Sequence, residues 1–99
     1  FTAPVTGKYF LSVKLRLDNI DSAADYYIPK IITSNHNYFD IIDPNFASDL
    51  SYFTQSITVV ADMDANDTAS VTIAQSGGTQ QTNVDGGATY TYFTGFLVC

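Results

Sequence analysis

The sequence predicts an all-β domain of the sandwich, barrel or jelly-roll kind. No segment has apolar residues at helical spacing, whereas several short stretches alternate between apolar and polar residues and are separated by turn-forming clusters. The 99 residues are enough for one domain with one core, and 45% of them are hydrophobic. We therefore expect a single domain over residues 1–99.

The first and clearest strand is expected from Lys8 to Leu17. Every second residue in this stretch is apolar, and the residues between them are polar except for Phe10. Residues 19–25 are mostly small and polar and predict a loop, after which residues 26–33 are rich in aromatic and β-branched side chains. Pro29 in this second strand indicates an edge position or a bulge, because proline has no N–H for a ladder hydrogen bond.

The middle of the chain predicts a hairpin arm followed by two strands. Residues 34–37 are a turn-type cluster, and residues 38–42 form a short strand after it. Apolar alternation resumes over residues 50–60, stops in the acidic stretch 62–67 and restarts over residues 69–73. We expect the acidic stretch to be the turn of a hairpin.

The C-terminal part combines a polar loop with a strand that is apolar on both faces. Residues 76–87 are polar and rich in glycine, which is typical of a long surface loop. The stretch 89–99 then alternates, with large side chains on both faces: Tyr90, Tyr92, Phe96 and Val98 on one, Phe93 and Leu97 on the other. Such a strand needs two partners, so we expect one sheet face to be covered by another copy of the chain.

The charge balance excludes two classes of partner. Ten aspartates and no glutamate, against three lysines and one arginine, give a net charge of −6. A phosphate backbone or an anionic membrane surface would be repelled, and the apolar runs are too short to span a bilayer. We expect no binding to nucleic acid and no membrane insertion. Cys99 is the only cysteine, so it either ends a strand or links to another chain.

Three segments, in the right order, resemble the globular heads of complement component 1q, which share a jelly roll with the tumour necrosis factor superfamily. Residues 1–11, FTAPVTGKYFL, are similar to that family's F-x-A-P-x-x-G-x-Y-x-F/L segment. Residues 64–71, DANDTASV, resemble its x-x-G-D-x-V turn, and residues 93–97, FTGFL, resemble its closing F-S-G-Y/F-L. Asn66 stands where the family usually has glycine, and asparagine tolerates the left-handed backbone such a turn needs.

The resemblance implies a homotrimer of jelly rolls in which the family's opening strands would precede residue 1. In that family the strand with G-x-Y-x-F and the closing strand pack near the threefold axis. This implies subunit contacts at Phe10, Ser12, Phe93 and Leu97. It also implies that the protomer core contains Tyr9, Leu11, Phe96 and Val98. An intrachain role for the four contact residues is the alternative.

The only metal-like pattern lies in the acidic turn. Asp62, Asp64 and Asn66 have the spacing of an oxygen-ligand calcium loop, with Asp67 beside them. The match fails at Asp67, where glycine is expected, and at Ile73, where a bidentate glutamate is expected. We therefore expect a solvated hairpin turn, no metal and no cofactor, with a non-helical calcium site as the alternative.

No catalytic grouping is visible. His36 is the sole histidine and has no second base at a recognisable spacing, and carboxylate pairs such as Asp40 and Asp43 are more simply turn residues. The sequence predicts a chain that is not an enzyme, which disfavours a stand-alone hydrolase of surface glycans.

The function expected from these observations is that of a trimeric structural and binding module. The polar style, rich in Thr, Asn, Asp and Ser, looks like domains of this family in bacteriophage and bacterial surface proteins, which implies an extracellular or virion-surface location among other fibre or virion proteins. Its ligand would be a host-surface glycan or protein receptor, bound by exposed loop residues: Asn35, His36, Asn37, Thr79, Gln80 and Gln81. The alternative is a secreted recognition or signalling ligand of the same family that binds a protein receptor.

Overall fold

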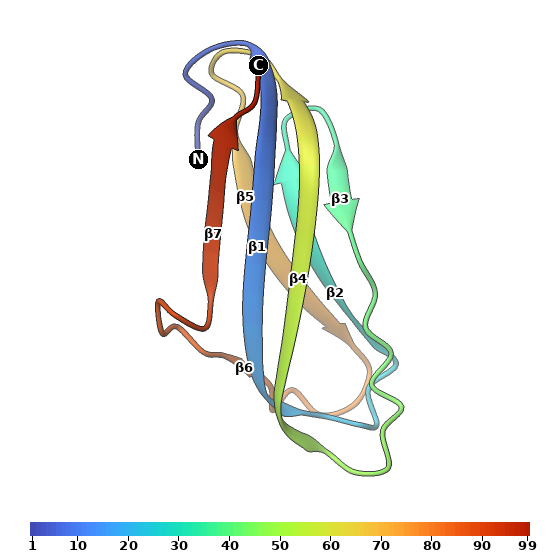
Figure 1. The fold of residues 1–99 in the computed structure, drawn as a ribbon. Helices are drawn as coiled ribbons and strands as arrows, with labels where there is room; N and C mark the ends of the chain where they lie inside the picture. Colours follow the sequence, from blue (N-terminus) through green and yellow to red (C-terminus); the bar gives the residue numbers. More distant parts are fainter.

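Two antiparallel sheets face each other and account for all the regular structure of the chain, which has no helix (Figure 1). The computed structural model describes residues 1–99. The strands are β1 (Gly7–Ile20), β2 (Tyr26–Thr33), β3 (Asn37–Phe39), β4 (Leu50–Met63), β5 (Ala69–Ser76), β6 (Asn83–Val84) and β7 (Tyr92–Leu97). The all-β prediction is confirmed, and the arrangement is that of a β-sandwich. The chain has no helix that would be long and apolar enough to cross a membrane.

β1 is the central strand of the first sheet. β4 pairs with it along its whole length, from Gly7 opposite Met63 to Ile20 opposite Leu50. β7 and the short β6 share its other side. The second sheet has the order β3-β2-β5. The folded molecule measures 46 × 25 × 16 Å along its principal axes. The fourteen residues of β1, at about 3.3 Å each, span roughly 46 Å, so β1 runs along the whole long axis of the molecule.

The core lies between the sheets and follows the alternation predicted for β1. Five alternate residues of this strand are buried: Tyr9, Leu11, Val13, Leu15 and Leu17. Tyr27 and Ile31 of β2 meet them from the second sheet. Burying one such side chain contributes about 1.5–3 kcal/mol, so this stripe is the main reason why the two sheets stay together.

β2 has the predicted bounds, but its proline is not at an edge. β2 lies between β3 and β5. The Pro29 carbonyl accepts a hydrogen bond from the Asp40 N–H at 3.1 Å, so the Pro29 nitrogen also points toward the β3 side, just beyond the end of that strand. No ladder bond to β5 is lost, which explains how a central strand tolerates a proline.

The acidic stretch 62–67 is not a hairpin turn. It leads from β4 in the first sheet to β5 in the second, so it crosses the sandwich. Asn66 adopts a left-handed φ of 75°, the backbone conformation that was expected at this position, where the resembled turn usually has glycine. The Asn66 N–H donates to the Ala3 carbonyl at 2.7 Å and the Ala3 N–H donates to the Asp67 carbonyl at 2.8 Å. The crossing is thus held by the N-terminal segment.

β7 faces opposite to the prediction. Phe93 pairs with Val13 and packs against the core, whereas Phe96 pairs with Phe10 on the outward face and is 60% exposed. Gly95 fixes this register, because a Cβ there would lie 2.6 Å from the Phe10 carbonyl oxygen. The assignments of Phe93 to the outside and of Phe96 to the core are therefore wrong.

The end of β7 also departs from simple alternation. Leu97 pairs with Tyr9 on the inward side of β1, not on the predicted outward side, yet it is 46% exposed at the end of the sandwich. The Lys8 N–H donates to the Cys99 carbonyl, while the Lys8 carbonyl accepts from the Val98 N–H. Two residues thus oppose one, as in a bulge, and Val98 is half exposed rather than buried in the core as predicted.

The glycine-rich loop is anchored more firmly than a surface loop needs. The buried Asp21 carboxylate accepts hydrogen bonds from the N–H groups of Ala23 and Thr79. The Asp21 N–H donates to the Tyr27 hydroxyl at 3.0 Å, and that hydroxyl lies 2.6 Å from the Thr82 hydroxyl. Gly78 has a φ of 68° and abuts Asp21, so a side chain there would collide. The stretch lies at the surface as predicted, with every residue exposed or half-buried, but it contains the short strand β6 and is held in place by these bonds.

Candidate functional site

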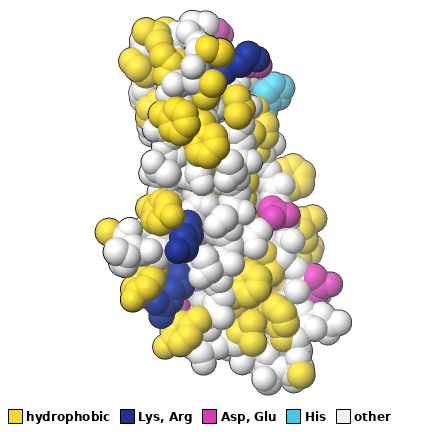
Figure 2. All heavy atoms as spheres, viewed as in Figure 1, with side chains coloured by type: hydrophobic (Ala, Val, Ile, Leu, Met, Phe, Trp, Pro, Cys, Tyr) yellow, Lys and Arg dark blue, Asp and Glu magenta, His cyan; other side chains and the backbone are white.

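The outward face of the first sheet carries the most unusual surface of the chain. β1 points six side chains outward: Lys8, Phe10, Ser12, Lys14, Arg16 and Asp18. Figure 2 shows this face, with a group of hydrophobic side chains at the end where the termini lie and others farther along, and with Lys and Arg side chains both at that end and farther along on the side of β7. The two halves differ in chemistry.

The first half is an apolar row that we define as Phe10, Val60 and Phe96. Phe10 pairs with Val60 on one side and with Phe96 on the other, so the three side chains lie abreast on neighbouring strands. The Phe10 and Phe96 rings stack with their centroids 4.9 Å apart. Val60 is 56% exposed and Phe96 60% exposed. A row of large apolar side chains in water marks a contact surface.

A polar strip separates the two halves. The Ser12 and Thr58 hydroxyl oxygens lie 3.3 Å apart, and Thr94 faces Ser12 from β7. The Lys14 ammonium lies 5.9 Å from the centre of the Tyr92 ring, at the limit of a cation–π contact. Ser12 therefore lies on the predicted outward face, as Phe10 does.

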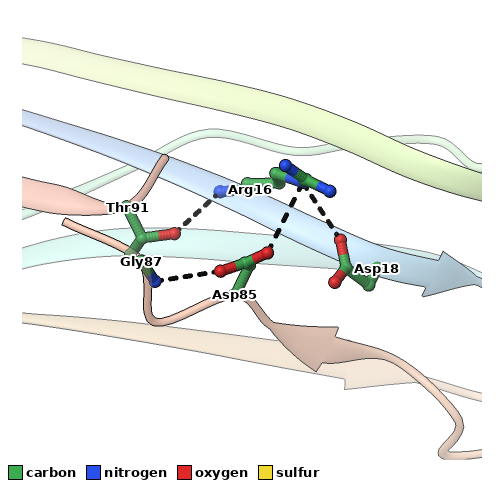
Figure 3. Close-up of polar contacts among 5 residues, drawn as sticks. All are labelled: Arg16, Asp18, Asp85, Gly87 and Thr91. Atoms are coloured by element: carbon green, nitrogen blue, oxygen red, sulfur yellow. Dashed lines mark hydrogen bonds and ion pairs between the residues drawn. The ribbon is translucent and has the colours of Figure 1, made fainter. Parts of the chain in front are cut away.

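The second half is an Arg16 cluster that we define as Arg16, Asp18, Tyr52, Asp85 and Tyr90. The guanidinium carbon lies 4.3 Å from the centres of both tyrosine rings. The Arg16 Nε lies 3.3 Å from an Asp18 carboxylate oxygen and 3.7 Å from one of Asp85, as Figure 3 shows. The cluster joins β1, β4 and the loop before β7 through one side chain.

The loop before β7 is built on the backbone of Arg16. The Arg16 N–H donates to the Thr91 hydroxyl at 3.1 Å, and its carbonyl accepts from the Asp85 N–H at 2.9 Å. The Asp85 carboxylate accepts in turn from the Gly87 N–H at 2.9 Å (Figure 3). These bonds hold Tyr90 beside the guanidinium, so the position of the ring depends on the backbone and not only on its own contacts.

Two opposing effects act on the guanidinium. Desolvation lowers the pKa of Arg16, but the nearby charges of Asp18 and Asp85 raise it, and the net result is a pKa above the ordinary value. Both ion pairs use Nε, and the two terminal nitrogens have no partner in the chain. Because no buried side-chain nitrogen or oxygen lacks a partner, these terminal groups face water.

The six loop residues predicted as ligand contacts form two groups at opposite ends of the sandwich. Asn35 donates to the Asp62 carbonyl at 2.9 Å and to the Asp67 carboxylate at 3.2 Å, beside the acidic crossing. His36 is exposed and packs edge-on against Tyr38, and Asn37 begins β3. Thr79, Gln80 and Gln81 lie near the other end of β1. The structure therefore does not bring the two groups into one site.

A polar cleft of about 240 Å³ lies at the end of β1 opposite the termini, lined by Asn19, Asp49, Leu50, Ser51 and Gln81. The Ser22 N–H and hydroxyl donate to the Asp49 carboxylate at 2.9 and 2.7 Å, and the Gln81 amide donates to it at 3.0 Å. The Ser22 N–H and then these side chains lower the pKa of Asp49 to about 2. Gln81 thus lines this cleft, whereas Asn35 lines a separate hollow of about 360 Å³ beside the acidic crossing and Asn37 one of about 160 Å³ beside β3.

The carboxylates of the acidic crossing are used within the chain. Asp62 pairs with the Lys8 ammonium at 3.2 Å, and the Asp67 carboxylate accepts the Asp64 N–H at 2.8 Å. No three His, Cys, Asp or Glu side chains come together in a way that would hold a metal ion. Asp62 lies at the end of β4, and Asp64, Asn66 and Asp67 lie in the crossing to β5. Asp40 and Asp43 likewise bind Gln55 and the Asn45 N–H.

The sequence did not reveal the Arg16 cluster, because its members are separated by up to 74 positions and meet only after three strands pair. Two signals pointed to parts of it. The one arginine lies on the polar side of β1, and Tyr52 was expected, with Tyr26 and Tyr27, to offer an aromatic platform for a sugar if it pointed outward; Tyr27 is buried, whereas Tyr26 and Tyr52 are exposed. Comparisons with protein-family models, curated proteins and solved structures returned no match for the chain.

Proposed function

We propose that the chain is a trimeric structural and binding module with a jelly-roll fold similar to complement component 1q heads, located on a phage fibre or virion surface. In this proposal it holds three chains together and attaches to a host-surface receptor or glycan. The observation that carries the proposal is the apolar row on the outward face of the first sheet.

The apolar row supports a contact with another copy of the chain. Phe96 and Val60 each leave more than half of their surface in water. Neither residue is needed by the core, which the opposite face of the same strands fills. Burying large side chains of this kind is worth about 1.5–3 kcal/mol each, so a second copy would gain stability by covering them.

The connections between strands support the jelly roll. Only β2 and β3 form a hairpin within one sheet. The chain passes from one sheet to the other between β1 and β2, β3 and β4, β4 and β5, and β5 and β6. Repeated crossing of this kind is typical of Greek-key and jelly-roll sandwiches and differs from a meander.

A second exposed patch supports a ring rather than a two-fold dimer. Phe39 and Ile41 are 62% and 59% exposed at the β3 edge, on the side of the sandwich opposite β7 (Figure 1). An isologous dimer uses one patch twice, whereas a cyclic trimer joins two different patches of each copy. The apolar row of one copy and the β3 edge of the next would form such a contact.

The experiment that tests this proposal is a mass measurement by size-exclusion chromatography with light scattering. We expect three times the chain mass for the natural sequence and a single chain mass for Phe96→Asp, because a buried charge would oppose the contact. Thr72→Asp is the matched control, since it puts the same charge on an exposed position of β5 and should leave the mass unchanged.

A single chain mass for the natural sequence would overturn the trimer. If a trimer is found, binding of the labelled protein to intact bacteria rather than to animal cells would support the virion role. The reverse preference would favour the secreted ligand of the same family.

A further inference from the structure

We propose that the Arg16 cluster is a binding site for a neutral pyranose sugar. The inference deepens the proposed function, since it gives the ligand class and the position of an attachment site outside the loops predicted from sequence. It rests on the geometry of one chain and does not require the trimer.

The two tyrosines each present an exposed aromatic ring that is held in place beside the guanidinium. Tyr52 is 65% exposed and Tyr90 47% exposed, although both rings lie against the guanidinium. Tyr52 is held by its place in β4 and Tyr90 by the loop bonds to the Arg16 backbone. Rings that are positioned before binding cost little conformational entropy when a ligand packs on them. The apolar C–H face of a pyranose is a ligand that fits such rings.

Arg16 adds hydrogen-bond donors that point to water. Both of its ion pairs use Nε, which leaves the two terminal NH₂ groups for a ligand. Its side chain is only 21% exposed, so the carboxylates and rings hold the fork in one place. A fixed fork loses less freedom on binding than a mobile lysine would.

Asp18 and Asp85 add acceptors beside these donors. Each carboxylate side chain is 26% exposed. A sugar hydroxyl both donates and accepts a hydrogen bond, so it matches a site that offers a guanidinium and carboxylates side by side. Hydroxyl groups on neighbouring ring carbons would use both partners at once.

The charges favour a neutral sugar over an acidic one. The positive charge of Arg16 is already opposed by Asp18 and Asp85, and the chain as a whole carries −6. A carboxylate ligand would meet this field and would compete with two carboxylates for the guanidinium. A neutral pyranose meets no such opposition. Three sites on one trimer would strengthen attachment through avidity.

The test is an NMR titration of the ¹⁵N-labelled chain with the methyl glycosides of glucose, galactose and mannose, up to about 100 mM. We expect at least one glycoside to shift the amide signals of Tyr52 and of residues 85–91, with a Kd on the order of 1 mM, as a small ligand allows. N-acetylneuraminic acid, the charged contrast, should bind more weakly.

Two variants locate the site. Tyr52→Ala removes an exposed ring and should raise the Kd at least about fivefold, with no loss of fold by circular dichroism. Tyr26→Ala is the matched control, an exposed tyrosine on the other sheet, and should change the Kd less than about twofold. Arg16→Lys keeps the charge but loses the planar fork, and should also weaken binding.

Three outcomes would overturn the inference. They are an absence of shifts with every glycoside, an equal effect of Tyr52→Ala and Tyr26→Ala, and tighter binding of N-acetylneuraminic acid than of the neutral sugars. The titration is repeated on the Phe96→Asp variant. Because the site lies within one chain, the same Kd is expected there, and the failure of the trimer is thereby distinguished from the failure of the sugar site.

Discussion

The two halves of the outward face of β1 differ in what builds them. The apolar row consists of residues from three paired strands and needs nothing except the register of the sheet. The Arg16 cluster needs the sheet for Tyr52 but a loop for Asp85 and Tyr90. The difference teaches that one alternating strand can carry a surface fixed by pairing at one end and a surface fixed by loop hydrogen bonds at the other.

The largest expected effect contrasts two phenylalanines of β7. Phe93→Ala should lower the free energy of unfolding by about 3 kcal/mol, because Phe93 packs against the core. Phe96→Ala should lower it by less than about 1 kcal/mol in the single-chain state, because Phe96 lies in water. Urea denaturation of the two variants and of the natural chain measures both values. Equal losses would contradict the opposite faces assigned to these residues.

A smaller effect is expected from Arg16→Met, which removes the centre of the cluster. The Asp85 carboxylate loses its ion pair and Tyr90 its cation, so the loop before β7 should open more often. Hydrogen exchange of the loop amides should become about tenfold faster, while the amides of Phe10 and Val60 keep their rates. Faster exchange at both halves would show that the two surfaces are not built independently.

The smallest effect concerns acid, at the end of β1 beyond the Arg16 cluster. The pKa of Asp49 is about 2 in the folded chain against an ordinary value of 3.8. Its hydrogen bonds therefore stabilise the fold above about pH 4, and this contribution is lost as the pH falls from about 4 to about 2. Asp49→Asn removes this dependence.

The midpoints of urea denaturation at pH 7, 4 and 2 measure this pH dependence of stability. The difference between the natural chain and Asp49→Asn should be constant from pH 7 to pH 4 and shrink below that. The apolar row contains no ionisable side chain, so Val60→Ser should shift the midpoint by the same amount at all three values. A constant difference for Asp49→Asn would contradict the lowered pKa.

The strands were predictable where one face is apolar and the other polar. In β1 the alternation indicates both the strand and its buried face, because only one face satisfies burial. β2 was predictable as a strand from its aromatic and β-branched residues, but apolar side chains on both of its faces left the buried face open. β7 is apolar on both faces, so the pattern is compatible with either orientation. The register came from Gly95, whose close approach to the Phe10 carbonyl is a contact between distant segments.

The connections and the site were less accessible to sequence reasoning. A turn sequence such as residues 62–67 indicates a reversal or crossing but carries no information about which sheet the next strand joins. A proline is excluded from a central strand only where the neighbour that its nitrogen faces needs an N–H for a ladder hydrogen bond. The Pro29 nitrogen faces β3, and that strand ends before it reaches this position. The Arg16 cluster depends on three segments at once, and no local pattern contains it.

The position of β7 has a consequence for synthesis of the protein. β1 is translated before its partners β4 and β7, which follow much later in the chain. Until β7 leaves the ribosome, β1 has one unpaired edge and the core lacks Phe93. Pairing between such distant segments is slow and exposes strand edges in the meantime. The nascent chain is therefore vulnerable to aggregation until β7 has been translated.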